Sequence, residues 1–387
     1  PTFVIGGGVL RVNSTSFDLG TAKAPILSLR GGTLEYDVSG GAFTFARSLG
    51  TFTGTVNWQA SLNTGSGGFS AYAGSSNSGA GNGNALTVNL GNANATLTWG
   101  TTASFVGDGL ALKFGSTKSN STVIWQNPLA LDGGTAGNAT IRQIDVTKGV
   151  GNAADKTQFT GAITGSSTTD LVKTGTGTLE FTANNTYSGN TLLAGGNLLL
   201  SHASALGGGG KIGFAGGTLQ WSANNTVDYS ARFSNGASQS YSLDTNGQSV
   251  TLATGLTSSG GTLTKLGAGS LALSGSNTYT GMTAVSGGTL KFALANALYG
   301  GNSTLWTAAN LNVKSGATLA FNVGGSGQFT TANVTTLLTN LAASSSATNG
   351  MNAGATLGFD LSSASITIAD IIADTTGAGG GLRNLVF

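Results

Sequence analysis

The sequence contains no cysteine, one histidine and three prolines among 387 residues, and only 8% of its residues are charged. The absence of cysteine excludes disulfide bonds and thiolate metal sites. The single histidine, His202, leaves no spare base for a Ser-His-Asp arrangement and no histidine-rich metal site. We therefore expect no metal and no other cofactor.

The scarcity of charge is far from the roughly 25% that is typical of soluble domains. The surface must then consist mostly of serine, threonine, asparagine and glycine, which suits a protein outside the cell. Sixteen Lys and Arg residues against fourteen Asp and Glu residues give a net charge of +2 and no basic stripe, so nucleic acid is a poor candidate partner. A protein this close to neutrality also lacks the self-repulsion that opposes assembly.

Two further classes are excluded by what the sequence lacks. Glycine is abundant, at 65 residues, but follows no strict three-residue period and occurs with little proline, which excludes collagen. No apolar run reaches the ~18 residues of a membrane-spanning helix. The chain opens at Pro1 without a charged and then apolar leader, so we expect that any export signal has been removed.

Two segments of the chain repeat each other without a gap. Residues 171–200 read LVKTGTGTLEFTANNTYSGNTLLAGGNLLL, and residues 263–292 read LTKLGAGSLALSGSNTYTGMTAVSGGTLKF. Each copy has two short runs in which apolar residues alternate with polar ones, separated by turns rich in asparagine and glycine. Alternation places one apolar face against a core. The core positions of the repeats are predicted to be Leu179, Phe181, Leu198, Leu200, Leu271, Leu273, Leu290 and Phe292.

Short strands joined by tight turns, and repeated, are typical of a β-solenoid. The pattern K-x-G-x-G-x-L-x-L, then N-T-Y-x-G, then G-G-x-L resembles the autotransporter-associated β-strand repeat, also called the passenger-associated transport repeat, of bacterial surface proteins. The resemblance covers both repeated segments, 171–200 and 263–292. It implies an all-β, right-handed parallel β-helix that is exported and displayed outside the cell, and it brings no catalytic residues.

We expect one continuous solenoid over residues 1–387, with two departures from the strand pattern. Residues 65–84 are rich in Gly, Ser and Asn and are predicted to form a long surface loop, either a flexible excursion or a contact loop. Val334, Leu337, Leu338 and Leu341 have the spacing of one helical face. They predict a short helix at about 331–343, with Thr330 or Thr331 as its N-cap. Residues 366–372 are predicted to return to strand or a mixed turn.

The two ends of the chain resemble unfinished coils. The first residues match the second half of a repeat, and the last residues match the segment that precedes the Lys-x-Gly of a repeat. An uncapped coil exposes β-edges that pair readily with another chain. We therefore predict self-assembly by head-to-tail stacking of subunits. The residues expected to take part are Thr2, Val4, Val9, Leu10, Leu382, Leu385, Val386 and Phe387.

Candidates for chemistry are few. Glu35 and Asp37 lie two positions apart on one strand face, where they form either a glycosidase-like carboxylate pair or, as we expect, a solvated face. Glu180 is replaced by alanine and His202 by leucine in the other repeat, so the repeat requires neither. No catalytic residue is predicted.

The sequence thus predicts a non-enzymatic, extracellular structural protein that forms a fibre or sheath at the bacterial cell surface. One alternative is an adhesin or carbohydrate-binding passenger whose partner is a surface polysaccharide or another surface protein, contacted through exposed Tyr72, Trp58 or Trp125. A second alternative is a β-helix enzyme that acts on polysaccharides.

Overall fold

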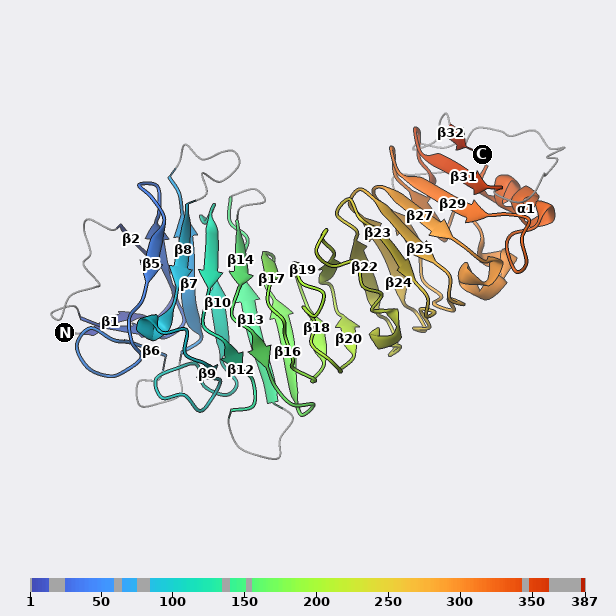
Figure 1. Cartoon of the computed structure of the whole chain (residues 1–387). Coiled ribbons are helices and arrows are strands. Elements are labelled where there is room, and N and C mark those ends of the chain that lie inside the picture. Colours follow the sequence, from blue (N-terminus) through green and yellow to red (C-terminus); the bar gives the residue numbers. More distant parts are fainter. Residues whose placement is uncertain are drawn as a thin grey trace. The chain divides into compact units, whose positions relative to one another are not determined.

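The computed structural model describes residues 2–13, 25–58, 65–74, 84–133, 140–150, 155–342, 348–361 and 384–386. They fall into two compact units, Pro1–Gly217 and Thr218–Phe387, blue to green and yellow-green to red in Figure 1. The strands of each unit pair in parallel, each with its counterpart in the preceding and the following coil. The predicted parallel β-solenoid is therefore confirmed. A single solenoid over residues 1–387 stays a prediction.

Unit 1 is built from two long sheets and two short ones. The first long sheet contains, in spatial order, β2 (Val9–Asn13), β4 (Thr33–Asp37), β7 (Gly67–Tyr72), β10 (Ala111–Phe114), β13 (Thr140–Val146), β16 (Thr169–Thr174), β18 (Thr191–Leu193) and β20 (Ile212–Phe214). The second contains β5 (Phe43–Phe45), β8 (Ala85–Val88), β11 (Thr122–Trp125), β14 (Lys156–Phe159), β17 (Thr178–Phe181) and β19 (Asn197–Leu200). The short sheets are β1 (Thr2–Ile5), β3 (Ile26–Leu29) and β6 (Val56–Asn57), and β9 (Leu97–Thr98), β12 (Leu129–Ala130) and β15 (Ile163–Thr164). A 3₁₀ turn, η1, covers Leu90–Asn92.

Unit 2 has two long sheets. One contains β21 (Thr218–Gln220), β22 (Ser240–Asp244), β24 (Thr262–Leu266), β26 (Thr283–Val285), β28 (Leu311–Val313) and β30 (Gly350–Met351). The other contains β23 (Ser249–Leu252), β25 (Ser270–Leu273), β27 (Thr289–Phe292), β29 (Thr318–Asn322), β31 (Thr356–Asp360) and β32 (Asn384–Val386). The remaining elements are η2 (Ser230–Arg232), η3 (Ala295–Ala297), η4 (Tyr299–Gly301), η5 (Ser303–Leu305) and α1 (Thr331–Leu341).

The register of the strands shows that the coils of the two repeats have the same length. Lys173 lies opposite Leu193 in the next coil, and Lys265 lies opposite Val285, so the step from one coil to the next is identical in both copies. Each repeat, at 171–200 or 263–292, is longer than this step and therefore covers more than one coil. Its two strand types occupy two different sides of the coil.

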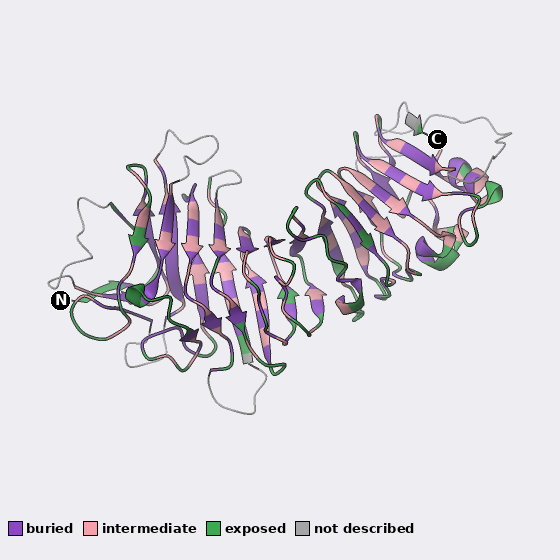
Figure 2. Ribbon diagram, viewed as in Figure 1, coloured by how far each residue is buried: buried purple, intermediate pink, exposed green. Residues whose placement is uncertain are grey.

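The core consists of the alternate residues of each strand, and Figure 2 shows buried and less buried residues alternating along the strands. Leu179 and Phe181 lie opposite Leu198 and Leu200 in the next coil. Leu271 and Leu273 lie in the same way opposite Leu290 and Phe292. All eight side chains are at most 1% exposed, so they stack as apolar ladders inside the coils, where burial stabilises each by roughly 1.5–3 kcal/mol.

The expected surface loop over residues 65–84 is wrong for Gly67–Tyr72, which forms β7 between β4 and β10. Phe69 on this strand is fully buried and contacts the rings of Phe45 and Trp58. A Cβ atom at Gly68 would collide with the carbonyl group of Lys113 on β10. Glycine is present here because two backbones approach closely, and not because the segment is a loop. Residues 75–83 of the predicted loop lie outside the described residues.

The predicted C-terminal helix is confirmed as α1, with Thr330 as its N-cap. Thr330 and Asn333 form a capping box, in which each side chain bonds to the backbone of the other residue. Val334, Leu337, Leu338 and Leu341 are the buried residues of α1. No helix in the described part of the chain is long and apolar enough to cross a membrane. The strand or turn expected at 366–372 lies outside the described residues.

Candidate functional site

The lysine of each repeat is buried and bonded to backbone carbonyl groups. Lys173 and Lys265 are 1% and 0% exposed. Lys173 Nζ donates to the carbonyl oxygens of Thr174 at 2.6 Å and Gly175 at 3.1 Å in its own turn, and to that of Gly195 at 3.0 Å in the next coil. The ammonium group therefore ties two successive turns together through charge-assisted hydrogen bonds.

Lys265 repeats this arrangement in the second copy. Its Nζ atom donates to the carbonyl oxygens of Leu266, Gly267 and Gly287 at 2.8, 2.8 and 3.1 Å. Burial lowers the pKa of both lysines to about 8, and the nearby carboxylates Asp145 and Asp244 oppose that shift. The lysines are thus structural clamps whose charge is costly to bury.

The asparagine of the N-T-Y motif joins three successive coils. Asn185 Oδ1 accepts a hydrogen bond from the backbone N–H of Ile163 at 2.8 Å, and its Nδ2 donates to the carbonyl oxygen of Ala205 at 2.7 Å. Asn277 does the same between Leu256 N–H and the carbonyl group of Ala297, at 2.7 and 2.6 Å. Both asparagines are at most 3% exposed. Each one satisfies a backbone group of the preceding coil and one of the following coil.

The tyrosine of the same motif is fully buried in both copies. Tyr187 and Tyr279 place their hydroxyl groups 2.9 and 2.6 Å from the hydroxyl groups of Thr191 and Thr283. In unit 2 the hydroxyl group of Tyr299 joins this cluster at 3.0 Å from that of Thr283. Burial raises the pKa of Tyr299 to about 12 and that of Tyr279 well above its ordinary value. These phenols therefore stay neutral and act as hydrogen-bonded packing groups.

The Gly-Gly turn of each repeat is also set by contact between coils. Gly196 and Gly288 have φ angles of 58° and 60°, in the left-handed region that favours glycine. A Cβ atom at either position would collide with a carbonyl oxygen of the preceding coil, from Gly177 and Gly269 respectively. The lysine, asparagine and glycine of the repeat thus serve the joining of coils, and the tyrosine packs and bonds within its own coil.

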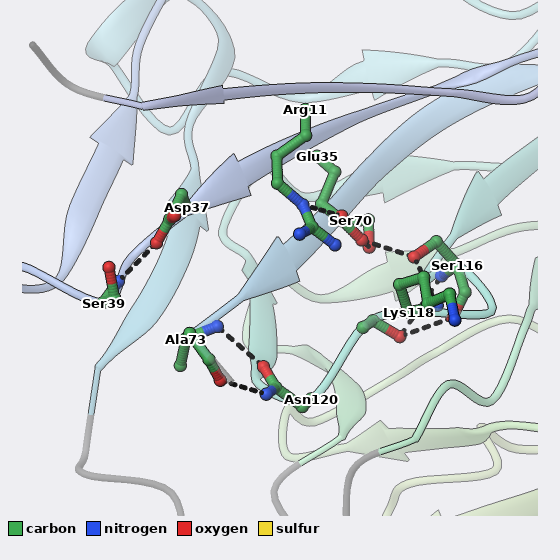
Figure 3. Close-up of polar contacts among 11 residues, drawn as sticks. Arg11, Glu35, Asp37, Ser39, Ser70, Ala73, Ser116, Lys118 and Asn120 are labelled. Carbon is green, nitrogen blue, oxygen red and sulfur yellow. Dashed lines mark hydrogen bonds and ion pairs between the residues drawn. The ribbon is translucent and has the colours of Figure 1, made fainter. Parts of the chain in front are cut away.

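Glu35, the candidate acid, is buried and not part of a solvated face, and that part of our expectation is wrong. It is 1% exposed and forms an ion pair with Arg11, with 2.6 Å between Nε and Oε1. The hydroxyl groups of Ser70, at 2.8 Å, and of Ser116 donate to its other oxygen, as Figure 3 shows. All these neighbours hold the carboxylate in place, so it is a structural anion between strands β2, β4 and β7.

Asp37, the other member of the pair, has a separate role. It accepts a hydrogen bond from the backbone N–H of Ser39 at 2.9 Å and so closes the turn after β4 (Figure 3). Elsewhere in unit 1, Asp155 accepts from the Ser119 hydroxyl at 2.8 Å and from Gly149 N–H at 2.7 Å. Burial raises the pKa of Asp155 despite these bonds. The carboxylates of Asp37 and Asp155 thus bind the protein's own turns.

Two further polar residues singled out from the sequence have local partners. Glu180 forms an ion pair with Lys156 at 2.6 Å and accepts from the Ser201 hydroxyl at 2.7 Å. His202 Nδ1 accepts from the backbone N–H of Ser204 at 3.0 Å and so shapes a turn. Among the described residues, no group of three or more His, Asp or Glu side chains could hold a metal ion.

The aromatic residues proposed as an exposed binding platform do not form one. Trp58 and Trp125 are fully buried in unit 1, and their rings pack against those of Phe69, Phe105 and Phe159. Tyr72 is half-buried, and the guanidinium group of Arg11 lies 3.4 Å from its ring centroid. Their large apolar rings help to fill the interior of the coils, so the tryptophans are core residues.

The residues predicted to mediate assembly lie on edge strands as far as the structure describes them. β1 pairs with β3 and β2 pairs with β4, and both stand at the ends of their sheets. Val4 is 50% exposed and Val9 47%, while Thr2 is exposed and Leu10 is half-buried. Phe3, which the sequence pattern did not single out, is 42% exposed. An apolar edge of this kind readily accepts another strand.

The C-terminal residues of that prediction are described in part. β32 is the end strand of its sheet and pairs with β31, and Val386 is 55% exposed. Leu385 lies in β32 opposite Leu357. Leu382 and Phe387 lie outside the described residues.

Comparisons with known proteins agree with the repeat. A family model described as the passenger-associated-transport-repeat matches residues 171–200 and 263–292, which confirms the resemblance seen in the sequence. Over 171 residues, 44% of this chain, the sequence is 35% identical to "Adhesin BmaC autotransporter" of Brucella suis biovar 1 (strain 1330). The chain covers 4% of the length of that relative. No solved structure matches the chain.

Proposed function

We propose that this chain is a non-catalytic β-solenoid scaffold displayed at the bacterial cell surface, as part of an adhesin-type passenger. The observation that supports this most directly is the placement of the repeat's polar side chains. Lys173, Asn185 and Tyr187 are all buried and bonded within or between coils, and so are their counterparts in the second repeat. A repeat whose recurring polar side chains are bonded internally builds a support, and these side chains are not available to a substrate.

The composition and the comparison support the same proposal. A surface with little charge and a chain without cysteine suit a protein that works outside the cell, where pH, salt and redox conditions change. The similar protein is named an adhesin autotransporter. We extend that role to this chain as surface display and adhesion.

Surface display is tested by labelling intact cells of the bacterium that makes the protein. An epitope tag inserted after Gly236, in a turn whose residues 235–238 are exposed, leaves the strands intact. Antibody should label unpermeabilised cells, and external protease should remove the label, while a cytoplasmic marker stays protected. Labelling that requires permeabilised cells would contradict the proposal.

We also propose that copies of the chain stack head to tail, with β1 and β2 of one copy beside the last strands of another. The one-sided pairing of these strands and the exposed side chains of Phe3, Val4, Val9 and Val386 support it. A heterologous contact that does not close on itself produces filaments. The same edges would accept further coils of a longer polypeptide, so the test must separate the two cases.

Electron microscopy of the purified chain makes this separation. Stacking predicts filaments for the unaltered chain and single particles for a Val4→Lys, Val9→Lys variant, because charge on an edge strand opposes pairing. Val227→Lys, at another exposed valine, 40% exposed in unit 2, is the matched control and should still form filaments. If the unaltered chain forms only single particles at all concentrations, stacking is refuted. The edge strands would then be expected to pair with further coils of a longer polypeptide.

A further inference from the structure

The outer face of one sheet in unit 2 carries a recess of about 590 Å³. It lies over β29, β31 and β32, which Figure 1 shows side by side in orange and red. Its lining includes Thr318, Ala320, Thr356, Gly358, Asp360 and Val386. The volume falls in the range of roughly 300–1,000 Å³ that is typical of small-molecule sites.

The register of the strands explains why the face is hollow here. Lys291, Ala320, Gly358 and Val386 occupy one outward row on successive strands. Ala320 and Gly358 have one side-chain carbon and none, so two adjacent strands form a low floor between the longer side chains of Lys291 and Val386. The core residues Leu319 and Leu357 lie beneath and are fully buried, which keeps this floor rigid.

Two flanks of the recess carry polar side chains that differ from each other, and Val386 and Leu361 add apolar lining. On one flank Thr318 and Thr356 lie opposite each other on adjacent strands. On the other flank Asp360 forms an ion pair with Lys291, with 2.9 Å between Oδ2 and Nζ, and both side chains are about one third exposed (39% and 31%). The recess therefore combines an apolar floor, the apolar side chains of Val386 and Leu361, two hydroxyl groups and the carboxylate of Asp360. Lys291 lies outside the lining and compensates the charge of that carboxylate.

We propose that this recess binds a neutral saccharide. A sugar ring has C–H faces that suit the floor of Ala320 and Gly358, and hydroxyl groups that both donate and accept hydrogen bonds. Its hydroxyl groups can donate to Asp360, and can donate to or accept from the two threonines. Since the ion pair has no net charge, it offers an anionic sugar no advantage. This binding role goes beyond the scaffold function and does not depend on it.

Gly358 provides a variant that fills the recess and keeps the fold. A Cβ atom there would lie 3.4 Å from Ala320 Cβ and 3.7 Å from Thr318 Cγ2, which are ordinary contacts. Valine favours strands, so Gly358→Val should fold and occupy the floor. Ala272→Val is the matched control, because Ala272 lies in the same outward row on β25, outside the lining of the recess.

The test is saturation-transfer NMR on the full chain with maltose, cellobiose and lactose, and with sialyllactose as the anionic counterpart. At least one neutral disaccharide should show saturation transfer from the unaltered chain and from the Ala272→Val variant. The Kd of that disaccharide should be more than tenfold higher for the Gly358→Val variant. Three results would overturn the proposal: no transfer to any neutral disaccharide, transfer to sialyllactose alone, or equal transfer to Gly358→Val. Binding of a neutral control peptide without binding of any sugar would overturn it as well. All these results leave the scaffold function untouched.

Discussion

At the scale of single residues, the two buried lysines give the repeat a distinctive dependence on pH. Their pKa of about 8 in the folded chain lies below the value of about 10.5 in the unfolded chain. Between these two values the unfolded chain binds more protons, so the free energy of unfolding rises as pH increases through the window. The tyrosines with a raised pKa act in the opposite direction above about pH 10, so the lysine effect is best seen between pH 8 and 9.5.

We therefore predict that the free energy of unfolding increases from pH 8 to 9.5 by up to about 2 kcal/mol per lysine. A double Lys173→Met, Lys265→Met variant should lose this increase, and Lys211→Met, at an exposed site, should retain it. Urea unfolding at several pH values measures the effect. An equal increase in the double variant would show that these lysines do not control it.

The asparagines make a second prediction at this scale. Asn277→Ala removes the partners of Leu256 N–H and of the Ala297 carbonyl group and leaves both backbone groups buried. The expected loss is about 2–6 kcal/mol, since each of the two unsatisfied groups costs roughly 1–3 kcal/mol. Ser276→Ala, at the exposed neighbouring position, should change little. Coincident urea midpoints for the two variants would rule out the link between coils.

The sequence predicted residues whose environment depends on local spacing and missed those whose environment depends on distant neighbours. Alternation was enough to identify Leu179 and Leu271 as core residues, because period two alone decides which face they occupy. Glu35 has neighbours that are 24, 35 and 81 residues away in the chain, and no local pattern indicates them. The lysine of the repeat was recognised as part of the sequence motif. Its contact with the Gly-Gly turn of the next coil could not be predicted, because that requires knowing the length of a coil.

At the scale of elements, the same distinction separates α1 from β7. The helix was predictable because its apolar spacing and its cap both lie within the one continuous segment Thr330–Leu341. The strand β7 was missed because its glycines resemble those of a loop. Gly68 is in fact required by the approach of β10, and Gly67 by the approach of Leu29 and Gly32, all of which are distant in the sequence and adjacent in space.

The cap of α1 can be tested with two matched substitutions. Thr330→Ala removes the side-chain acceptor of the Asn333 N–H group and should destabilise unit 2 by about 1 kcal/mol. Thr339→Ala, near the end of the helix, replaces an exposed residue with a better helix former and should be neutral or stabilise by a few tenths of a kcal/mol. Thermal unfolding followed by circular dichroism compares them. Equal shifts in both variants would exclude a specific capping role.

At the scale of the whole molecule, a solenoid gains its stability from contacts between neighbouring coils. The links made by lysine and asparagine occur in both repeats and join each coil to the next, so they should make these regions the most stable parts of the chain. The proposed scaffold function depends on this, because a support must remain folded when it is exposed to the environment. We therefore expect the repeats to be rigid because their polar side chains join the coils.

Native-state hydrogen exchange of the full chain, read by mass spectrometry, tests this origin of rigidity most directly. We predict that the amides of β16–β19 and β24–β27 exchange most slowly, and that the exposed turn at residues 235–237 exchanges fastest and serves as the internal reference. Ser238 is left out of the reference because its N–H donates to the carbonyl oxygen of Ser259. Asn277→Ala should speed exchange in β24–β27 and leave β16–β19 unchanged. Exchange in the repeats as fast as in the reference turn would contradict a scaffold built on links between coils.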